Sequence, residues 1–384
     1  MNRRRFLAGS LALASARLFA APSAPGRVLL VFLRGGYDAA NVLVPVSSTF
    51  YYESRPNIAI AREAALPVDA DWGLHPALGP TLHAMFERRE AAFIPFAGTE
   101  DLSRSHFETQ DSIELGQPPG THGYASGFMN RLAAAIGAGS ALSFTNQLPV
   151  AFRGEAHVAN VAPGAVVRGG LDARQSALIA SMYKGTPLDA QVSEGFASRD
   201  AVMKELGDEM MAASRSAVSA RGFELQAERV ARLMKEKYRL GFIDIGGWDT
   251  HVGEGGAAGY LALRLDELGR GLDAFAQAMQ GAWRNTVVIV ISEFGRTFRE
   301  NGNRGTDHGH GTVYWVLGGG VRGGRLAGAQ QRIARETLFQ DRDYPVLNEY
   351  RALLGGLFGR VYGLDASQLA RVFPGATARD LGLV

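Results

Sequence analysis

The chain has 384 residues, of which 46% are hydrophobic and 20% charged, and its formal net charge is +2. This composition is ordinary for a soluble globular protein and excludes fibrous and intrinsically disordered classes. The length suits one α/β domain with insertions. Because the chain contains no cysteine, any metal must be held by carboxylate, imidazole or hydroxyl groups, and cysteine nucleophiles and disulfides are excluded.

The N-terminus has the features of an export signal. Three arginines, Arg3–Arg5, precede an apolar run and a zone of small residues around Ala20 to Ala24. This pattern predicts a signal peptide over residues 1–24, and "RRRFL" fits the twin-arginine type. A membrane anchor is the alternative interpretation, but Arg17 interrupts the apolar run, which is too short to span a bilayer. We expect a periplasmic or secreted protein, exported by the twin-arginine machinery, with no stable membrane span after processing.

Removal of this segment changes the charge balance. Residues 1–24 carry four arginines and no acid, so the formal net charge falls by four units, from +2 to −2. No basic patch remains that predicts nucleic-acid binding, and no polybasic run predicts contact with a lipid surface.

Short apolar runs alternate with segments of helical spacing along the rest of the chain. The predicted strands lie at Val28–Leu33, at 91–98 and within 239–251, 285–295 and 311–321, and the predicted helices at 73–90, 103–116, 199–238 and 259–283. Gly116 is placed to end the second helix. Residues 141–154 contain strand-like pieces, and 155–200 show weak periodicity.

This alternation predicts the fold class. Strands that are apolar throughout are typical of a sheet buried on both faces, and intervening helices favour parallel pairing. We expect a three-layer α/β/α fold with a largely parallel sheet. It would form a single domain over residues 25–384, with an irregular or helical insertion at about 155–235.

Polar residues gather near the ends of the predicted strands. They are Asp38, Ser105 with His106, Asp249 with His251, Glu293, and Asp307 with His308 and His310. In open α/β sheets ligands bind beyond the carboxyl ends of the strands, so we expect these five groups to converge on one rim.

Two short motifs predict metal ligands. "GGWDTH" places Asp249 and His251 two residues apart, and "GTDHGHG" does the same for His308 and His310, so an extended chain directs each pair to one face. Three of only eight histidines lie in these motifs. Imidazole with carboxylate suits Zn²⁺, Mn²⁺ or iron. The alternative interpretation is an exposed polar loop, and Asp38 taken alone is more simply a turn aspartate.

Ser103, Ser105 and His106 lie where a strand leads into a helix. A hydroxyl there can cap the helix, act as a nucleophile or help bind an anion. "GGGVRG" (318–323) matches a dinucleotide-binding pattern, but no clear helix opens there, so such a site is not predicted. The chain has no G-x-S-x-G segment, which disfavours an α/β-hydrolase esterase.

Several motifs together resemble an exported bacterial family known as "domain of unknown function 1501". They cover nearly the whole chain after the signal peptide and comprise "FLRGGYDAANVLVP", "GLHPAL", "SRSHFETQD", "GGWDTH", "VVIVISEFGRT", "GTDHGHGTVYWVLGGGVRGG" and the closing "VFPG". That family in turn resembles the alkaline phosphatase and sulfatase superfamily. The resemblance implies metal ligands at strand ends and a nucleophile at a helix N-terminus.

The resemblance also implies roles for individual residues. Asp38 resembles the first-strand aspartate, and Glu293 takes the place of an aspartate at the end of another strand. His251 resembles the histidine before the long helix, with Asp249 as its companion. His310, or else His308, resembles the last metal histidine.

Three departures from the superfamily pattern stand out. Phe294 stands where the second metal has a histidine. Asp249 precedes His251 by two residues, whereas a spacing of four is usual. The nucleophile position falls on His106, with Ser105 one residue away. A serine there would attack, whereas a histidine would imply a phosphohistidine, an extra metal ligand or no nucleophile.

The function implied by the resemblance is an exported metal-dependent hydrolase or transferase acting on a phosphate or sulfate ester, either a small molecule or an envelope component. The expected cofactor is a divalent metal, with zinc as first choice and Mn²⁺ or Ca²⁺ as alternatives. Asp249, His251 and His310 would hold one cation, with Asp38 and Glu293 at a second or shared position.

Ser105 or a water would attack the ester, while Arg296 or Arg34 neutralises developing charge. Two other hypotheses remain open. One is a non-catalytic envelope protein that keeps the fold, and the other is a metal-free acyl hydrolase that uses Ser105 and a histidine.

Overall fold

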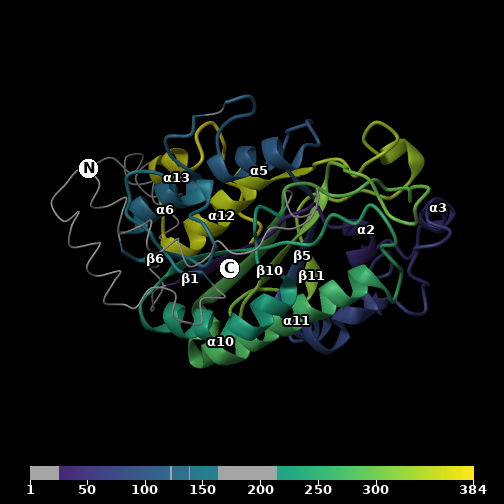
Figure 1. Ribbon diagram of the computed structural model, residues 1–384, viewed down its shortest axis with the longest axis horizontal. Helices are drawn as coiled ribbons and strands as arrows, with labels where there is room; N and C mark the ends of the chain where they lie inside the picture. Colours follow the sequence, from purple (N-terminus) through teal and green to yellow (C-terminus); the bar gives the residue numbers. More distant parts are fainter. Residues whose placement is uncertain (1–25, 122, 138, 163–213) are drawn as a thin grey trace, which may run out of the picture.

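The computed structural model describes residues 26–121, 123–137, 139–162 and 214–384 (Figure 1). The predicted signal peptide, and residues 163–213 of the predicted insertion, lie outside the described residues. Each of the five predicted strands is present, and so are the helices predicted within 103–116 and 259–283. Of the helix predicted over 199–238, residues 220–236 are helical and 214–219 are not, while 199–213 lie outside the described residues.

The centre of the protein is a nine-stranded mixed sheet, in the order β11-β5-β10-β9-β1-β8-β6-β7, with β12 also paired to β5. The strand β1 is central and runs parallel to both neighbours, so that Val31 lies beside Ile243 on one side and Val290 on the other. The strands are β1 (Arg27–Leu33), β5 (Ala91–Gly98), β6 (Ala141–Ser143), β7 (Ala159–Asn160), β8 (Leu240–Ile245), β9 (Thr286–Ser292), β10 (Thr312–Leu317), β11 (Arg325–Leu326) and β12 (Asn348–Glu349).

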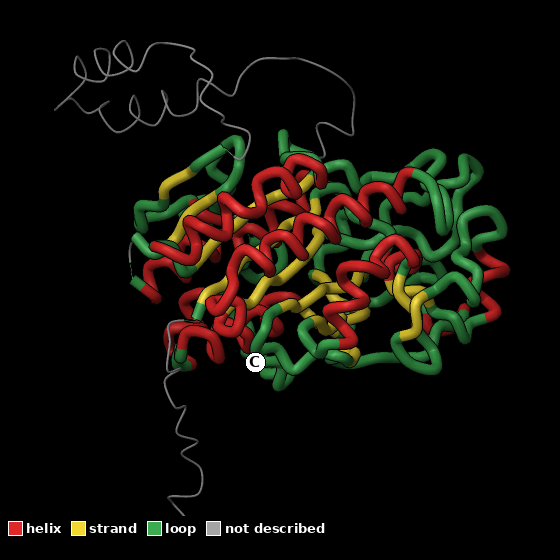
Figure 2. Tube along the Cα trace, turned by 90° about the horizontal axis from the view of Figure 1, so that it is seen from below, coloured by secondary structure: helices red, strands yellow, loops and turns green. Residues whose placement is uncertain are grey.

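Helices cover both faces of this sheet (Figures 1 and 2). On one face lie α10 (Ala220–Glu236) and α11 (Tyr260–Met279), and on the other α5 (His106–Leu115), α6 (Phe128–Ile136), α12 (Tyr350–Tyr362) and α13 (Ala366–Val372). Alternate residues of β1 enter the two hydrophobic cores: Leu29, Val31 and Leu33 belong to one, and Val28, Leu30 and Phe32 to the other. The predicted three-layer α/β/α fold is therefore confirmed.

One strand departs from the parallel arrangement, and this departure shapes the functional edge. The strand β10 runs antiparallel to both β5 and β9. Its amino end therefore lies at the edge where β1, β5, β8 and β9 have their carboxyl ends. The segment before β10 thus joins the segments that follow the other four strands, which is why residues 307–310 can share their rim.

Smaller elements complete the part of the chain that the structure describes. They are the helices α2 (Ala39–Val42) and α3 (Thr49–Ser54), a three-stranded sheet of β2 (Leu43–Val44), β4 (Gly73–Leu74) and β3 (Leu66–Pro67), and the 3-10 turns Val150–Phe152, Gln280–Asn285 and Arg335–Thr337.

The helix predicted over 73–90 is broken into three pieces. A 3-10 turn (Pro76–Leu78) leads into a π-turn (Gly79–His83) and then a single α-helical turn, α4 (Ala84–Glu87). Pro80 explains the break, because it has no N–H to donate and its ring crowds the preceding turn.

The helix α12 was not among the predicted elements. Its sequence contains Gly355, Gly356 and Gly359, and each glycine lowers helix propensity. Packing explains one of them, since a Cβ on Gly356 would lie 2.0 Å from the carbonyl oxygen of Arg379. The close approach of the C-terminal segment therefore requires a glycine at this position of the helix, although glycine has a low helix propensity.

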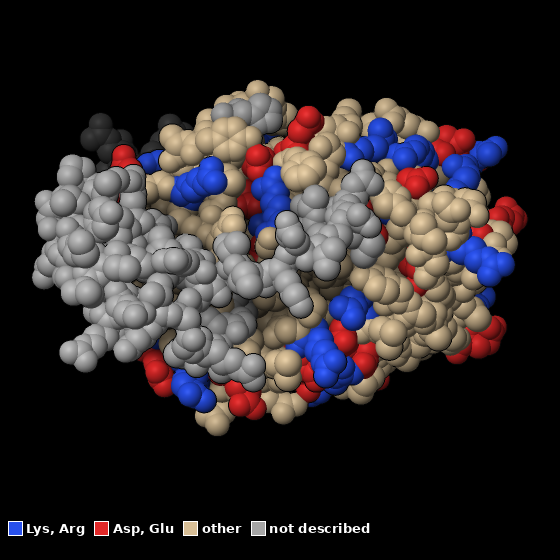
Figure 3. Space-filling model, viewed as in Figure 1, with Lys and Arg blue, Asp and Glu red and all other residues tan. Residues whose placement is uncertain are grey.

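Charged side chains of both signs are interspersed on the face of the protein shown in Figure 3. Among the helices that the structure describes, none combines the length and the hydrophobicity needed to cross a membrane.

Two leucines of α11 test the packing of this helix on the sheet. Leu265 is fully buried, whereas Leu263 on the same helix is 62% exposed. We expect Leu265→Ala to lower the free energy of unfolding by about 2–5 kcal/mol, because it leaves a cavity in the core. The matched control Leu263→Ala should change it by less than about 0.5 kcal/mol. Denaturant unfolding measures both, and equal effects would contradict the assigned face of α11.

Candidate metal centre

Four chain segments meet at the edge described above. His106 is the first residue of α5, directly after Ser105, whose hydroxyl caps the helix by accepting from the N–H of Glu108 at 3.5 Å. Asp249 and His251 follow β8. The remaining segments contribute Glu293, immediately after β9, and His308, shortly before β10.

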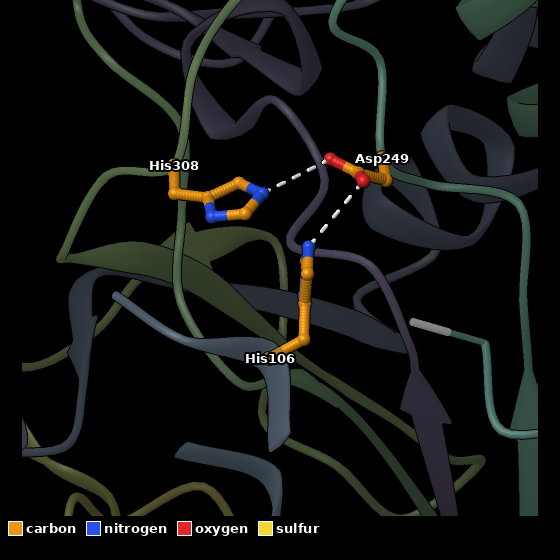
Figure 4. Close-up of side chains that lie close together, drawn as sticks. All are labelled: His106, Asp249 and His308. Atoms are coloured by element: carbon orange, nitrogen blue, oxygen red, sulfur yellow. Dashed lines mark ion pairs between the residues drawn. The ribbon is translucent and has the colours of Figure 1, made fainter. Parts of the chain in front are cut away.

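The rings of His106 and His308 point toward the carboxylate of Asp249 (Figure 4). Its Oδ1 lies 3.0 Å from Nε2 of His251 and 3.4 Å from Nε2 of His308, while its Oδ2 lies 3.4 Å from Nε2 of His106. One donor atom from each of His106, Asp249 and His308 lies within 4.8 Å of the others. Around Zn²⁺ with bonds of about 2.0–2.1 Å, neighbouring tetrahedral ligands are about 3.3–3.4 Å apart. The distances from His106 and His308 to Asp249 are close to this value, each to a different oxygen of the carboxylate.

The other ring nitrogen of each histidine contacts an oxygen. Nδ1 of His106 lies 2.8 Å from Oε1 of Glu293, and Nδ1 of His308 lies 2.9 Å from the carbonyl oxygen of Arg104. Nδ1 of His251 lies 3.3 Å from Oδ1 of Asp307. These oxygens only accept, so a neutral ring that donates from Nδ1 to its oxygen presents a free lone pair at Nε2. Such outer partners are typical of metal-bound histidines.

In that tautomer the Nε2 lone pairs face a carboxylate, which is repulsive unless a proton or a cation lies between them. His251 and His308 even bring their Nε2 atoms within 3.0 Å of each other. A bound cation removes the repulsion, and so does a proton on one of the nitrogens. The geometry therefore calls for a proton or a cation between these nitrogens and the carboxylate.

Without a cation, a proton on His106 supplies the positive charge. Burial opposes protonation of His106, but its contacts with Asp249 and Glu293 outweigh burial and raise the pKa of His106 to about 9. Burial likewise opposes ionisation of Asp249, but contacts with His106 and His308 and the charge of Arg296 hold the pKa of Asp249 well below its usual range. Nε2 of His106 is buried and, at 3.4 Å from Asp249, makes no well-formed hydrogen bond within the described structure.

Arg296 and Glu293 support the centre from behind. The guanidinium of Arg296 is buried and donates to Oδ1 of Asp249 at 2.6 Å, and also to the hydroxyl and carbonyl oxygens of Thr306. Oε1 of Glu293 accepts from the N–H of Gly35 and from Nε2 of Gln110, both at 2.8 Å. Both side chains therefore already form hydrogen bonds to other groups of the protein.

Other predicted site residues lie apart from these contacts. Asp38 is buried, caps α2 through the N–H of Ala40 and forms a two-point ion pair with Arg55. His310 is buried with its ring centroid 5.0 Å from that of Phe339, and burial together with the nearby charge of Arg104 lowers the pKa of His310 to about 4.

Arg34 is also committed elsewhere. Its guanidinium is buried and forms ion pairs with Asp244 at 2.7 Å and Glu114 at 2.8 Å. Of the predicted residues, the structure brings together His106, Asp249, His251, Glu293, Arg296 and His308, with Ser105 adjacent in the chain.

Phe294 closes one side of the centre. Its ring is buried, with its centroid 4.9 Å from the His106 ring and 5.2 Å from the His308 ring. The ring also packs against the backbone of Gly36, where a Cβ would lie 2.5 Å from it. On this side the two histidines therefore meet an apolar surface.

The support from Gln110 and from the Arg104 carbonyl was not predicted from the sequence. Every residue has a backbone carbonyl, so the sequence could not show that the carbonyl of Arg104 points at His308. Gln110 follows His106 by four residues on α5, and this helical spacing could have indicated that the two side chains share a face.

Comparison with known families shows to which family the chain belongs. The sequence profile of the family described as "Protein of unknown function (DUF1501)" matches residues 25–373. The chain belongs to this family. The membership predicted from the sequence motifs is therefore confirmed. No curated protein matches the chain.

Solved structures with a related overall fold include an alkaline phosphatase superfamily protein and a sulfatase. A protein in the alkaline phosphatase superfamily from Vibrio parahaemolyticus is 11% identical, with a TM-score of 0.41 over 99% of this chain and 80% of the other. A lipoteichoic acid synthase from Listeria monocytogenes is 8% identical, with a TM-score of 0.39 over 94% and 76%. A 2-O GAG sulfatase is 11% identical, with a TM-score of 0.33 over 93% and 76%. Likeness at this level transfers no activity to this chain.

The raised pKa of His106 predicts how the stability of chelator-treated protein depends on pH. The pKa is about 9 in the folded protein and about 6.5 unfolded, so the stabilisation is complete below about pH 6.5 and is lost as the pH rises through about 9. Relative to His106→Gln, the wild type should lose about 3 kcal/mol of unfolding free energy across this range. Denaturant unfolding at several pH values measures the difference, and a pH-independent difference would contradict the assigned ion pairs.

Proposed function

We propose that the protein is an exported metal-dependent hydrolase or transferase of phosphate or sulfate esters. The observation that carries the proposal is the convergence of three imidazole Nε2 atoms on the carboxylate of Asp249, each ring having Nδ1 committed to an oxygen. Export through the twin-arginine pathway is part of the proposal and rests on "RRRFL" near the N-terminus.

His106, Asp249 and His308 would hold the cation, and the fourth position, on the side of the exposed His251, would be left for water or substrate. A nitrogen-rich set of this kind favours Zn²⁺, with Mn²⁺ as an alternative, over Ca²⁺, which prefers oxygen donors. A bound cation would polarise the ester oxygen and lower the pKa of a water beside it.

The protein's own residues determine from which side a substrate can approach. The side chains of His106 and Asp249 are buried, whereas those of His251 and Asp307 are 40% and 52% exposed. A substrate would therefore enter from the side of His251 and Asp307. Because His106 directs Nε2 into the centre as a ligand, it would not itself attack the ester. The attacking group would then be a water or the hydroxyl of Ser105 at the start of α5.

We further propose one cation rather than two. The buried ring of Phe294 lies against both His106 and His308 and offers no ligand atom. Metal analysis of the purified protein should accordingly give a stoichiometry of about one Zn²⁺ per chain. A value close to two would contradict this part of the proposal.

Ligand substitutions test the centre itself. We expect Asp249→Asn and His308→Ala to weaken Zn²⁺ binding by more than about 100-fold, since each removes a direct ligand rather than an outer partner. Calorimetric titration of chelator-treated protein measures the affinity. His310→Gln is the matched control, because His310 is two residues away and contacts Phe339 instead. It should leave the affinity within about threefold. Equal losses in His308→Ala and His310→Gln would contradict the ligand set.

Turnover is tested on the same proteins with phosphomonoesters, phosphodiesters and sulfate esters, with Zn²⁺, Mn²⁺ and Ca²⁺ supplied in turn. We expect hydrolysis by the wild type and its loss in Asp249→Asn and His308→Ala. Metal binding without turnover of any ester would favour a non-catalytic envelope protein. Activity that survives prolonged chelation and depends on Ser105 would favour the acyl hydrolase.

A further inference from the structure

Arg104 has a backbone conformation that residues other than glycine rarely adopt. Its φ is +53°, in the left-handed region where a side chain crowds the backbone. The neighbouring turn is fixed by two local hydrogen bonds, from the N–H of Ser103 to Asp101 at 2.8 Å and from the N–H of Ser105 to the Ser103 hydroxyl at 3.3 Å. Such strain persists only where surrounding contacts hold it.

This conformation directs the backbone of Arg104 at the candidate metal centre. Its carbonyl oxygen accepts from Nδ1 of His308 at 2.9 Å. Two residues later the chain starts α5 with His106. One strained residue therefore influences two of the histidines, one through its carbonyl and one through the course of the chain.

The side chain of Arg104 is held by a buried acid. Nε and Nη2 donate to Oδ2 of Asp343 at 3.0 and 2.7 Å, and Nη2 also donates to Gln340 at 2.6 Å. The Asp343 side chain is fully buried, and its backbone exchanges hydrogen bonds with Phe339 at 3.0 and 2.8 Å. The guanidinium is thus attached to a fixed point outside the centre.

We propose that Arg104 is a positioning residue of the metal centre. Its ion pair with Asp343 holds the strained turn, the turn keeps the carbonyl on Nδ1 of His308, and that hydrogen bond fixes the ring so that Nε2 faces Asp249. The inference rests on the proposed metal site. A merely structural ion pair between two loops would instead affect stability and leave the ring of His308 unchanged.

Comparison of two substitutions separates the backbone from the guanidinium. Arg104→Gly keeps the carbonyl and adopts a positive φ without strain, whereas Arg104→Ala must bear the strain without its anchor. We expect Arg104→Ala and Asp343→Asn to weaken Zn²⁺ binding about 10- to 100-fold, as loss of an outer partner of a metal histidine does. Arg104→Gly should weaken Zn²⁺ binding by a smaller factor, less than about a third of the factor measured for Arg104→Ala.

A second measurement follows the ring of His308 directly. In chelator-treated wild type, ¹H–¹⁵N NMR of the imidazole nitrogens should show His308 with its proton on Nδ1. Arg104→Ala should shift it to a mixture of tautomers, and Arg104→Gly should largely restore the wild-type pattern. Arg89→Ala is the matched control, because Arg89 also has a positive φ, +62°, but lies before β5 at the opposite edge of the sheet. It should change neither the affinity nor the tautomer.

The outcomes keep this inference separate from the proposed function. If the wild type binds no Zn²⁺, the proposed function fails, while the tautomer of His308 in the metal-free protein still decides the role of Arg104. Unchanged affinity and tautomer in Arg104→Ala would overturn the inference. Equal effects of Arg104→Gly and Arg104→Ala would also overturn it, since the backbone conformation would then have no part in positioning His308.

Discussion

The contact on which the site depends is the carboxylate of Asp249 facing the Nε2 atoms of three histidines. Potential acceptor groups converge there in a buried place, and the arrangement is repulsive unless a proton or a cation lies between them. Arg296 supplies part of the positive charge through its 2.6 Å hydrogen bond to Asp249. The rest comes from a proton on His106 or, under the proposed function, from a cation. Glu293, Asp307 and the Arg104 carbonyl each contact Nδ1 of one histidine and so help to keep its ring in this orientation.

The sheet brings these groups together through the direction of a single strand. Four segments reach the edge because β1, β5, β8 and β9 end there, and the fifth reaches it because β10 runs the opposite way. Glycines then allow close approach. A Cβ on Gly309 would lie 2.4 Å from the carbonyl of Arg296, and one on Gly36 would lie 2.5 Å from the ring of Phe294. The polar rim therefore depends both on the direction of β10 and on glycines where its segments pack closely together.

The positions of His308 and His310 show the limit of pattern-based reasoning at this site. Two residues apart, both would face one side of an extended chain, and the sequence-based prediction preferred His310 to His308 as the ligand. The chain instead bends at His310, after His308 pairs with Arg296 across the rim. His308 consequently faces Asp249, while His310 packs on Phe339. Asp38 is a similar case, because the buried Arg55 that binds it is 17 residues away in the chain.

The sequence by itself determined the strands, the layers and the family. Continuous apolar runs and helical spacing are local properties, so β1, β5, β8, β9, β10 and the helix α11 could be predicted from them, and with them the rim where Asp249, His106 and Glu293 lie. The orientation of each side chain on that rim was decided only by the tertiary structure. It depends on the reversed strand β10, on long-range partners such as Arg55 for Asp38 and Asp343 for Arg104, and on backbone carbonyls whose direction no residue type specifies. These are interactions between distant segments, and their energies exist only once the chain has folded.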